Sequence, residues 1–158
     1  MRRRTIDWEA LRREVGDRCF ICELLAGNPE FRHHVVYEDG HSVAFLQRFQ
    51  TLYGYVIVAP REHREQVTGD FRLDEYLALQ AVVYRVGEAV RRAVPTERLY
   101  LLSLGSQDGN NHVHWHLAPL PPGVPVEEQQ LAALDTDEGL DLGEGDLQEL
   151  AGRIKAAL

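Results

Sequence analysis

Histidine occupies every second position in one short segment of the chain. In residues 112–118, His112, His114 and His116 alternate with apolar side chains. Successive side chains of a β-strand point to opposite faces of a sheet, so the alternation predicts a strand with three imidazoles on one face and a core on the other. Such a row suits nucleophilic, acid–base or metal chemistry near neutral pH, although a half-exposed strand can also carry histidines without a role.

The spacing of apolar residues elsewhere predicts an α+β fold. Strands are expected at residues 35–38, 42–46, 55–59, 99–104 and 112–120, with a hairpin turn at 39–40. Helical spacing over 70–94 predicts one long helix, in which Gly87 permits a close approach to the sheet. Short helices are expected at 5–15, capped by Thr5 or Asp7, and at 147–158, and a turn or short helix at 19–26. The acidic stretch 124–141 is expected to be irregular. The elements together predict an antiparallel sheet covered by one long helix.

Composition limits the class of protein. The chain has 158 residues, of which 44% are hydrophobic and 27% charged, as expected for one globular domain over 1–158. It contains no apolar run of transmembrane length, and no apolar signal core follows the basic start, so we expect a cytoplasmic protein without a membrane partner. A formal net charge of −8 argues against nucleic-acid binding but does not exclude a small phosphorylated ligand.

Two kinds of chemistry fit the histidines. In phosphoryl transfer the middle imidazole attacks phosphorus while a protonated neighbour and the polar loop 106–111 hold the phosphate. His-x-His on a strand also chelates metals, but a cupin-like site needs a carboxylate shortly after the pair, where this chain has Ala118, Pro119 and Leu120. The only cysteines, Cys19 and Cys22, form a CxxC pair, which in a cytoplasmic protein favours metal binding or redox chemistry over a structural disulfide.

Several segments, taken in order, resemble one family. The triad matches the alternating signature of the histidine triad (HIT) superfamily, and similar segments are residues 19–27, 37–39 with 44–46, and 54–63. The resemblance covers about residues 19–120, leaving the helix at 5–15 and a C-terminal extension at 121–158 outside it. It implies a five-stranded antiparallel sheet and a homodimer.

The resemblance also implies a reaction. His114 would be the nucleophile that forms a nucleotidyl-histidine intermediate on the α-phosphate, His116 would contact the phosphate oxygens, and His112 would support the nucleophile. Nucleoside phosphoramidates or dinucleoside polyphosphates would be the substrates, and water or another acceptor would release the nucleoside monophosphate. The alternative is a nucleotide-binding sensor or scaffold with little turnover.

The nucleotide pocket is where this chain departs from its relatives. Phe45, with Leu46 and Phe20, would wall the base, unless these residues serve only in core packing. Gln47 stands where relatives often hold the ribose with a carboxylate or amide. Tyr55 follows Gly54, where many relatives have Gly-His.

The loop before the triad departs as well. Gly109 stands where many relatives have Ser or Thr to serve the leaving group, so that Gln107, Asn110 or Asn111 would contact the nucleotide instead. Ordinary turn chemistry is the other interpretation of these polar residues.

The resemblance implies a second site. Some HIT proteins and the related galactose-1-phosphate uridylyltransferases bind structural zinc through ligands that match Cys19, Cys22, His63 and His112 here. His33 or His34 would be alternatives to His63, and a pair of reduced thiols without metal is the other interpretation. Zinc on His112 would orient the nucleophile indirectly.

Overall fold

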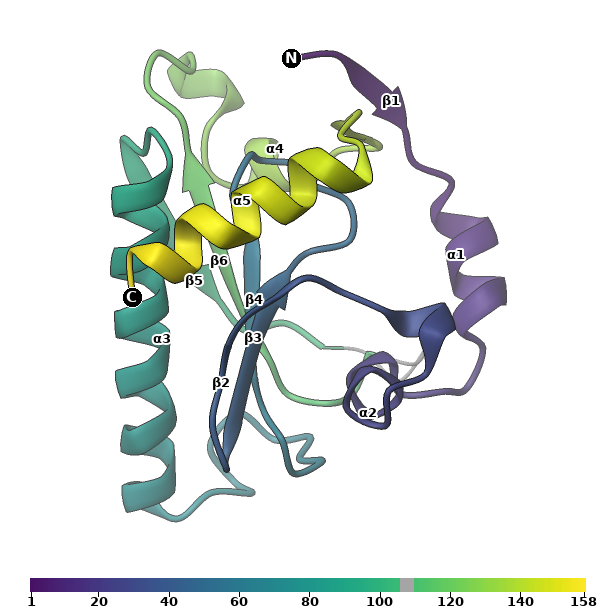
Figure 1. Ribbon diagram of the computed structural model, residues 1–158, viewed down its shortest axis with the longest axis vertical. Helices are drawn as coiled ribbons and strands as arrows, with labels where there is room; N and C mark the ends of the chain where they lie inside the picture. The colour runs from purple at the N-terminus through teal and green to yellow at the C-terminus, as the bar shows by residue number, and fades with distance from the viewer. Residues whose placement is uncertain (106–109) are drawn as a thin grey trace.

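A five-stranded antiparallel sheet forms the centre of the computed structural model, which describes residues 1–105 and 110–158 (Figure 1). Its strand order is β2-β3-β4-β6-β5. The strands are β2 (Val35–Glu38), β3 (Ser42–Leu46), β4 (Val56–Pro60), β5 (Arg98–Leu102) and β6 (Trp115–Leu120). Every neighbouring pair is antiparallel, which confirms the predicted fold class.

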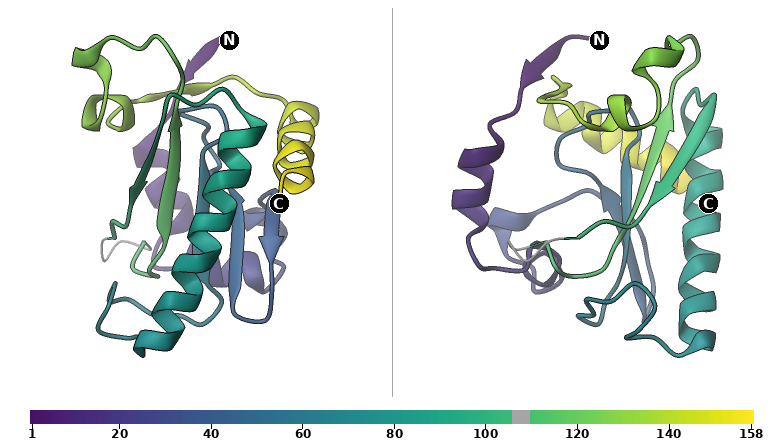
Figure 2. Two further views of the ribbon diagram at one scale, coloured as in Figure 1. Left: turned by 90° about the vertical axis from the view of Figure 1, so that its left-hand side faces the viewer. Right: turned by 180° about the vertical axis from the view of Figure 1, so that it is seen from behind.

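One face of the sheet is covered by the long helix α3 (Leu73–Ala93), as predicted (Figures 1 and 2). The apolar residues that alternate with the histidines pack with this helix in the main core, and they are Val113, Trp115 and Leu117. A Cβ on Gly87 would lie 3.0 Å from Leu99 Cδ2, so the glycine does permit close contact with the sheet. The C-terminal helix α5 (Glu144–Ala156) buries Leu150, Ala151 and Ile154 in the same core.

The opposite face receives the N-terminal helices α1 (Trp8–Val15) and α2 (Phe20–Leu25), followed by the 3₁₀ turn η1 (Pro29–Phe31) (Figure 2). Ile21 is fully buried there against Phe45 and Ile57, and this contact brings the CxxC segment onto the sheet. Asp7 caps α1 by accepting a hydrogen bond from Ala10 N–H at 2.8 Å, so the helix begins at Trp8, three residues later than predicted.

The prediction that residues 124–141 are irregular is wrong. It contains η2 (Val126–Glu128), α4 (Leu131–Leu134) and the strand β7 (Glu138–Leu140). Strand β7 pairs with β1 (Arg3–Thr5), which the sequence assigned to no strand. These strands were missed because each has its hydrogen-bonding partner more than a hundred residues away. Among the described residues, none of the helices combines the length and apolar character that crossing a bilayer requires.

The predicted strand 112–120 is too long, because β6 begins at Trp115. Before that point the backbone bonds to a loop rather than to a neighbouring strand. Val113 N–H donates to Arg64 O at 2.6 Å, and Ser103 Oγ donates to His114 O at 2.7 Å. His112 and His114 therefore lie on the segment that leads into the sheet, and His116 alone of the three lies within it.

The backbone at Gly54, which precedes Tyr55, can be tested by adding a Cβ. Its φ is +93°, and a Cβ there would lie 2.9 Å from Val94 Cγ2. We expect Gly54→Ala to lower the free energy of unfolding, measured in denaturant, by about 2–4 kcal/mol, because backbone strain and overpacking add. Gly123→Ala is the matched control, since φ there is +84° and no atom lies within 4 Å of the added Cβ. Equal losses in the two variants would contradict the proposed overlap with Val94.

Candidate functional site

The three histidines divide into two groups. The Nδ1 atom of His112 lies 3.4 Å from Cys19 Sγ, and its ring centre is 4.8 Å from that of His63. The rings of His114 and His116, by contrast, neighbour each other with centres 4.7 Å apart. The triad therefore contributes one imidazole to a cysteine–histidine cluster and two to a separate pair.

His114 is held in one orientation and one tautomer. It is 1% exposed, and its Nδ1 lies 2.7 Å from the carbonyl oxygen of His112. A carbonyl can only accept, so Nδ1–H donates and Nε2 keeps its lone pair. Burial lowers the pKa of His114, which keeps the imidazole neutral at pH 7. A neutral ring with a free Nε2 lone pair is suited to nucleophilic attack.

His116 is half-buried beside a tyrosine. Its Nδ1 lies 3.1 Å from the Tyr55 hydroxyl oxygen, and the two rings meet edge to face with centres 5.8 Å apart. Burial lowers the pKa of His116 to about 4 and raises the pKa of Tyr55 to about 12. The imidazole is therefore neutral and the phenol protonated at pH 7.

Aromatic rings line the space beside His114. The centre of the Phe20 ring lies 5.8 Å from that of His114 and 6.3 Å from that of Phe45. Phe45 is completely buried, so the half-buried Phe20 is the ring that a ligand reaches first. His33, which the sequence offered only as a spare metal ligand, lies 5.0 Å from Phe45. Leu46 lies in the core on the α3 face, so the core-packing interpretation applies to this residue.

Gln47 and Tyr55 are positioned by a residue that the sequence did not single out. Gln50 is 1% exposed, and its Nε2 donates to the carbonyls of Gln47 and Tyr55 at 2.8 and 2.9 Å. Its Oε1 accepts from the N–H groups of Gly54 and Tyr55. No described residue donates to the buried Oε1 of Gln47, which is therefore an unsatisfied acceptor. A glutamine in a polar loop carries no local signal of such a role.

The three loop residues predicted to contact the nucleotide are Gln107, Asn110 and Asn111. Gln107 lies outside the described residues. Asn110 is half-buried beside Gly105, and Asn111 donates through Nδ2 to Glu65 Oε1 at 2.6 Å. The side chain of Asn111 thus bonds to the carboxylate that also lies beside His63 of the cysteine–histidine cluster. A role of Asn111 in nucleotide binding stays a prediction.

The predicted zinc ligands come together. The ligand atoms of the four side chains all lie within 4.8 Å of one another, and the set is Cys19, Cys22, His63 and His112. Sulfur–nitrogen distances are 3.4 Å for Cys19–His112, 3.4 Å for Cys22–His63 and 3.6 Å for Cys22–His112. With Zn–S bonds of about 2.3 Å and Zn–N bonds of about 2.0–2.1 Å, a tetrahedral zinc ion separates such atoms by about 3.5 Å. These three sulfur–nitrogen distances therefore fit a zinc ion between the four side chains.

Both histidines of this cluster have an oxygen partner on the far side of the ring. His112 Nε2 lies 2.9 Å from Pro60 O, and His63 Nε2 lies 3.2 Å from Glu65 Oε1. These acceptors favour a proton on each Nε2, which leaves both Nδ1 lone pairs facing the sulfurs. This is the arrangement that metal-ligating histidines require.

The two cysteine sulfurs also suit a bound cation. The alternative ligands His33 and His34 have other partners. Burial and the neighbouring Cys19 raise the pKa of Cys22 to about 11, and a divalent cation between the sulfurs would reverse that effect. His33 Nδ1 lies 2.7 Å from Phe31 O, and His34 lies 3.4 Å from Glu144. His63, rather than the alternatives His33 and His34, therefore lies with the cysteines.

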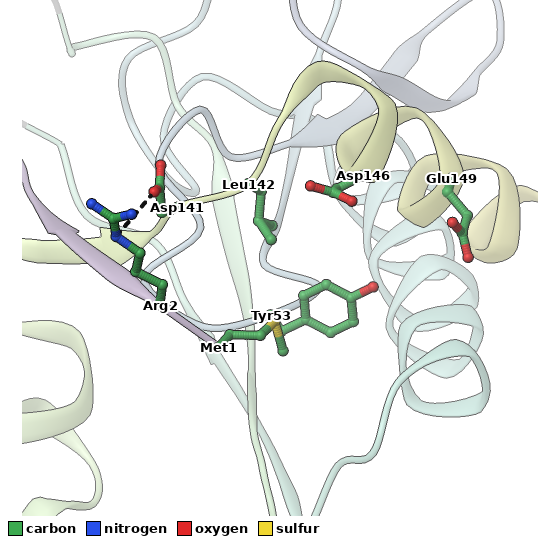
Figure 3. Close-up of a pocket in the computed structure, with 7 residues that line it drawn as sticks. All are labelled: Met1, Arg2, Tyr53, Asp141, Leu142, Asp146 and Glu149. Carbon is green, nitrogen blue, oxygen red and sulfur yellow. Dashed lines mark ion pairs between the residues drawn. The ribbon is translucent and has the colours of Figure 1, made fainter.

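A pocket of about 290 Å³ lies elsewhere, between the two residues before β1, Tyr53, the segment after β7 and α5 (Figure 3). Among the lining residues drawn in Figure 3, Arg2 forms an ion pair with Asp141 at 3.6 Å, and Asp146 and Glu149 project from α5. Three carboxylates beside one arginine repel a phosphate. None of the predicted site residues lines this pocket, so the histidine pair remains the candidate site for a nucleotide.

Comparisons of the sequence and of the structure with known proteins all point to one family. The family model described as HIT domain matches residues 28–122. Protein hit of Bacillus subtilis is 30% identical over 110 residues, which are 67% of this chain and 72% of that protein. The structure of a hypothetical histidine triad nucleotide-binding protein from Sulfolobus tokodaii superposes with a TM-score of 0.69 at 24% identity, over 88% of this chain and 91% of that chain. A zinc-bound histidine triad family protein from Mycobacterium smegmatis gives 0.65 at 19% identity over the same shares. These two structures show that the fold is shared.

Gln50 can be tested against another glutamine. We expect Gln50→Ala to lower the free energy of unfolding by about 2–4 kcal/mol, because it removes four hydrogen bonds and leaves the buried N–H of Gly54 without a partner. Gln80→Ala is the control, since no described residue hydrogen-bonds its buried Nε2, and its cost should stay below about 1 kcal/mol. Denaturant unfolding measures both, and similar losses would show that the bonds of Gln50 contribute nothing.

Proposed function

This chain belongs to the HIT family, and from that premise we propose that it is a nucleotide hydrolase or transferase. It would cleave the α-phosphate bond of a nucleoside phosphoramidate or dinucleoside polyphosphate. The observation that carries the proposal is the bond from His114 Nδ1–H to the His112 carbonyl, which leaves a neutral imidazole with a lone pair on Nε2.

In the first step His114 Nε2 attacks the α-phosphorus. A phosphorus–nitrogen bond forms as the bond from phosphorus to the leaving amine or phosphate breaks, and the leaving group takes the bonding pair and a proton from solvent. The ring then carries positive charge, which the His112 carbonyl stabilises by accepting from Nδ1–H at 2.7 Å. In the second step water or another acceptor attacks the same phosphorus. An oxygen–phosphorus bond forms as the phosphorus–Nε2 bond breaks, the bonding pair returns to Nε2, and the proton of the acceptor passes to solvent.

The surroundings of His114 suit a nucleoside. Phe20 offers a half-buried ring for the base, and Phe45 supports Phe20 from behind. Gln47 Oε1 offers an acceptor that no described residue uses, as a ribose hydroxyl would require. We propose further contacts from Gln107, Asn110 or Asn111 to the phosphate or leaving group.

We also propose that Cys19, Cys22, His63 and His112 hold a structural zinc ion. The support is the closeness of their ligand atoms, with three sulfur–nitrogen distances of 3.4–3.6 Å, and a histidine triad neighbour from Mycobacterium smegmatis is described as zinc-bound. Zinc would neutralise the two thiolates and tie the start of α2 to the segment before β6. The residues of this chain would do the rest, since His112 offers its carbonyl to His114.

The alternative function is a nucleotide-binding sensor or scaffold with little turnover. It is favoured by the altered positions for the ribose, at Gln47, and for the leaving group, at Gly109. A homodimer, a cytoplasmic location and a single domain over 1–158 also remain proposals from the sequence. The edge strand β5 exposes Leu101 by 54%, which is compatible with pairing of two copies.

The covalent intermediate separates the two functions. Mixing the protein with adenosine phosphoramidate or diadenosine polyphosphates, then quenching, should give an adenylylated protein by mass spectrometry. His114→Ala should abolish the adduct and lower the rate of AMP release by about 10³-fold or more, because the nucleophile is gone. His41→Ala, in the exposed β2–β3 turn, should react like wild type. Binding without adduct or AMP release across this panel would support the sensor and contradict the enzyme.

Metal analysis tests the zinc site. Protein never exposed to a chelator should contain one zinc ion per chain, and Cys22→Ser or His63→Ala should lose most of it, because three ligands hold zinc more weakly than four. His34→Ala should keep the metal, since His34 pairs with Glu144. Chelation should lower the melting temperature by several degrees, as expected where metal binding contributes to folding. Wild-type protein without stoichiometric zinc would contradict the proposal.

A further inference from the structure

We propose that Tyr55 is a positioning residue that fixes the tautomer of His116. The Tyr55 hydroxyl donates a hydrogen bond to His116 Nδ1, so the single ring proton of the neutral imidazole sits on Nε2. His116 then serves as an N–H donor beside the lone pair of His114. The tautomer is inferred from this contact and from the burial of both groups, and its catalytic consequence rests on the proposed function.

The position of the tyrosine is fixed on several sides. Tyr55 is 7% exposed, and its ring meets the His116 ring edge to face at 68°. Gln50 binds both the N–H and the carbonyl of Tyr55, and Gly54 precedes it at a φ that favours glycine. The hydroxyl oxygen lies 3.1 Å from His116 Nδ1, which is a normal hydrogen-bond length. The phenol therefore reaches the imidazole from a rigid backbone.

The direction of the hydrogen bond follows from what each group needs. If His116 donated from Nδ1–H, the phenol would accept, and no described residue would accept the phenolic proton inside a buried site. If the phenol donates, both groups at this contact are satisfied, and Nε2–H of the half-buried His116 is left for a ligand. Burial also raises the pKa of Tyr55 to about 12, so its proton is present throughout the neutral range.

The two neighbouring imidazoles then have opposite tautomers. His114 carries its proton on Nδ1, which faces the His112 carbonyl, and His116 carries its proton on Nε2. Their ring centres are 4.7 Å apart, so one phosphate can meet a lone pair and an N–H together. Attack on phosphorus needs a nucleophile and a donor to the phosphate oxygens. Tyr55 lets a neutral His116 supply that donor without becoming an imidazolium.

Nitrogen NMR of the free protein tests the tautomer directly. In long-range ¹H–¹⁵N spectra of wild type near pH 7, His116 should show a protonated Nε2 and an unprotonated, hydrogen-bonded Nδ1. Tyr55→Phe keeps the ring packing but removes the donor, so His116 should become a mixture of tautomers. Tyr84→Phe, on the exposed side of α3, should leave the spectrum of His116 unchanged. A wild-type His116 protonated on Nδ1, or one whose tautomer is unaltered in Tyr55→Phe, would overturn the inference.

Kinetics then tests the consequence. With adenosine phosphoramidate as substrate, Tyr55→Phe should lower kcat by about 10- to 100-fold and change KM little, because the lost donor acts most strongly in the transition state. Full kcat in Tyr55→Phe would overturn the catalytic part of the inference. Wild-type protein that shows the expected tautomer but forms no adduct would refute the proposed function and leave the positioning role of Tyr55 supported.

Discussion

The hydrogen bond between His114 Nδ1 and the carbonyl of His112 joins the two halves of the candidate site. His112 turns its ring towards the cysteines and its carbonyl towards His114, so the metal-ligand cluster and the proposed nucleophile share one residue. Both rings are almost completely buried, which makes any unpaired nitrogen there costly. A shift of the His112 ring would move the acceptor that sets the tautomer of His114, which explains how a structural ion would affect the chemistry.

The two faces of the sheet make this arrangement possible. On one face, the apolar residues beside the histidines pack against α3. On the other, α2 packs through Ile21 onto β3 and β4 and thereby places Cys19 in contact with His112, which is 93 residues later in the chain. Closing so long a loop costs conformational entropy, which the burial of these apolar side chains offsets.

Local patterns predicted the parts of the fold that local physics controls. The spacing of apolar residues located α3 and the strands β2 to β5 to within a few residues, because each period reflects one buried face. The same approach extended β6 too far, since Val113 N–H bonds to Arg64 rather than to a strand. It missed β1 and β7 because neither is a strand without the other. The family resemblance named the cysteine–histidine set. Gln50 gave no signal because its hydrogen bonds depend on how the turn from Gln47 to Tyr55 folds, and the place of His33 beside Phe45 depends on packing between two segments.

The sequence by itself determined which chemical groups are present and on which side of the core they fall. The alternation from His112 to His116 placed imidazoles opposite the α3 core, which restricted the chemistry to nucleophilic, acid–base or metal roles. Only the tertiary structure decided how the three imidazoles divide and which nitrogen of each carries the proton. The position of the proton follows the hydrogen-bond partner of each ring. The partner of His112 is Pro60, at the end of β4, and the partner of His116 is Tyr55, just before β4. Both partners lie more than fifty residues earlier in the chain, so no local pattern reveals them.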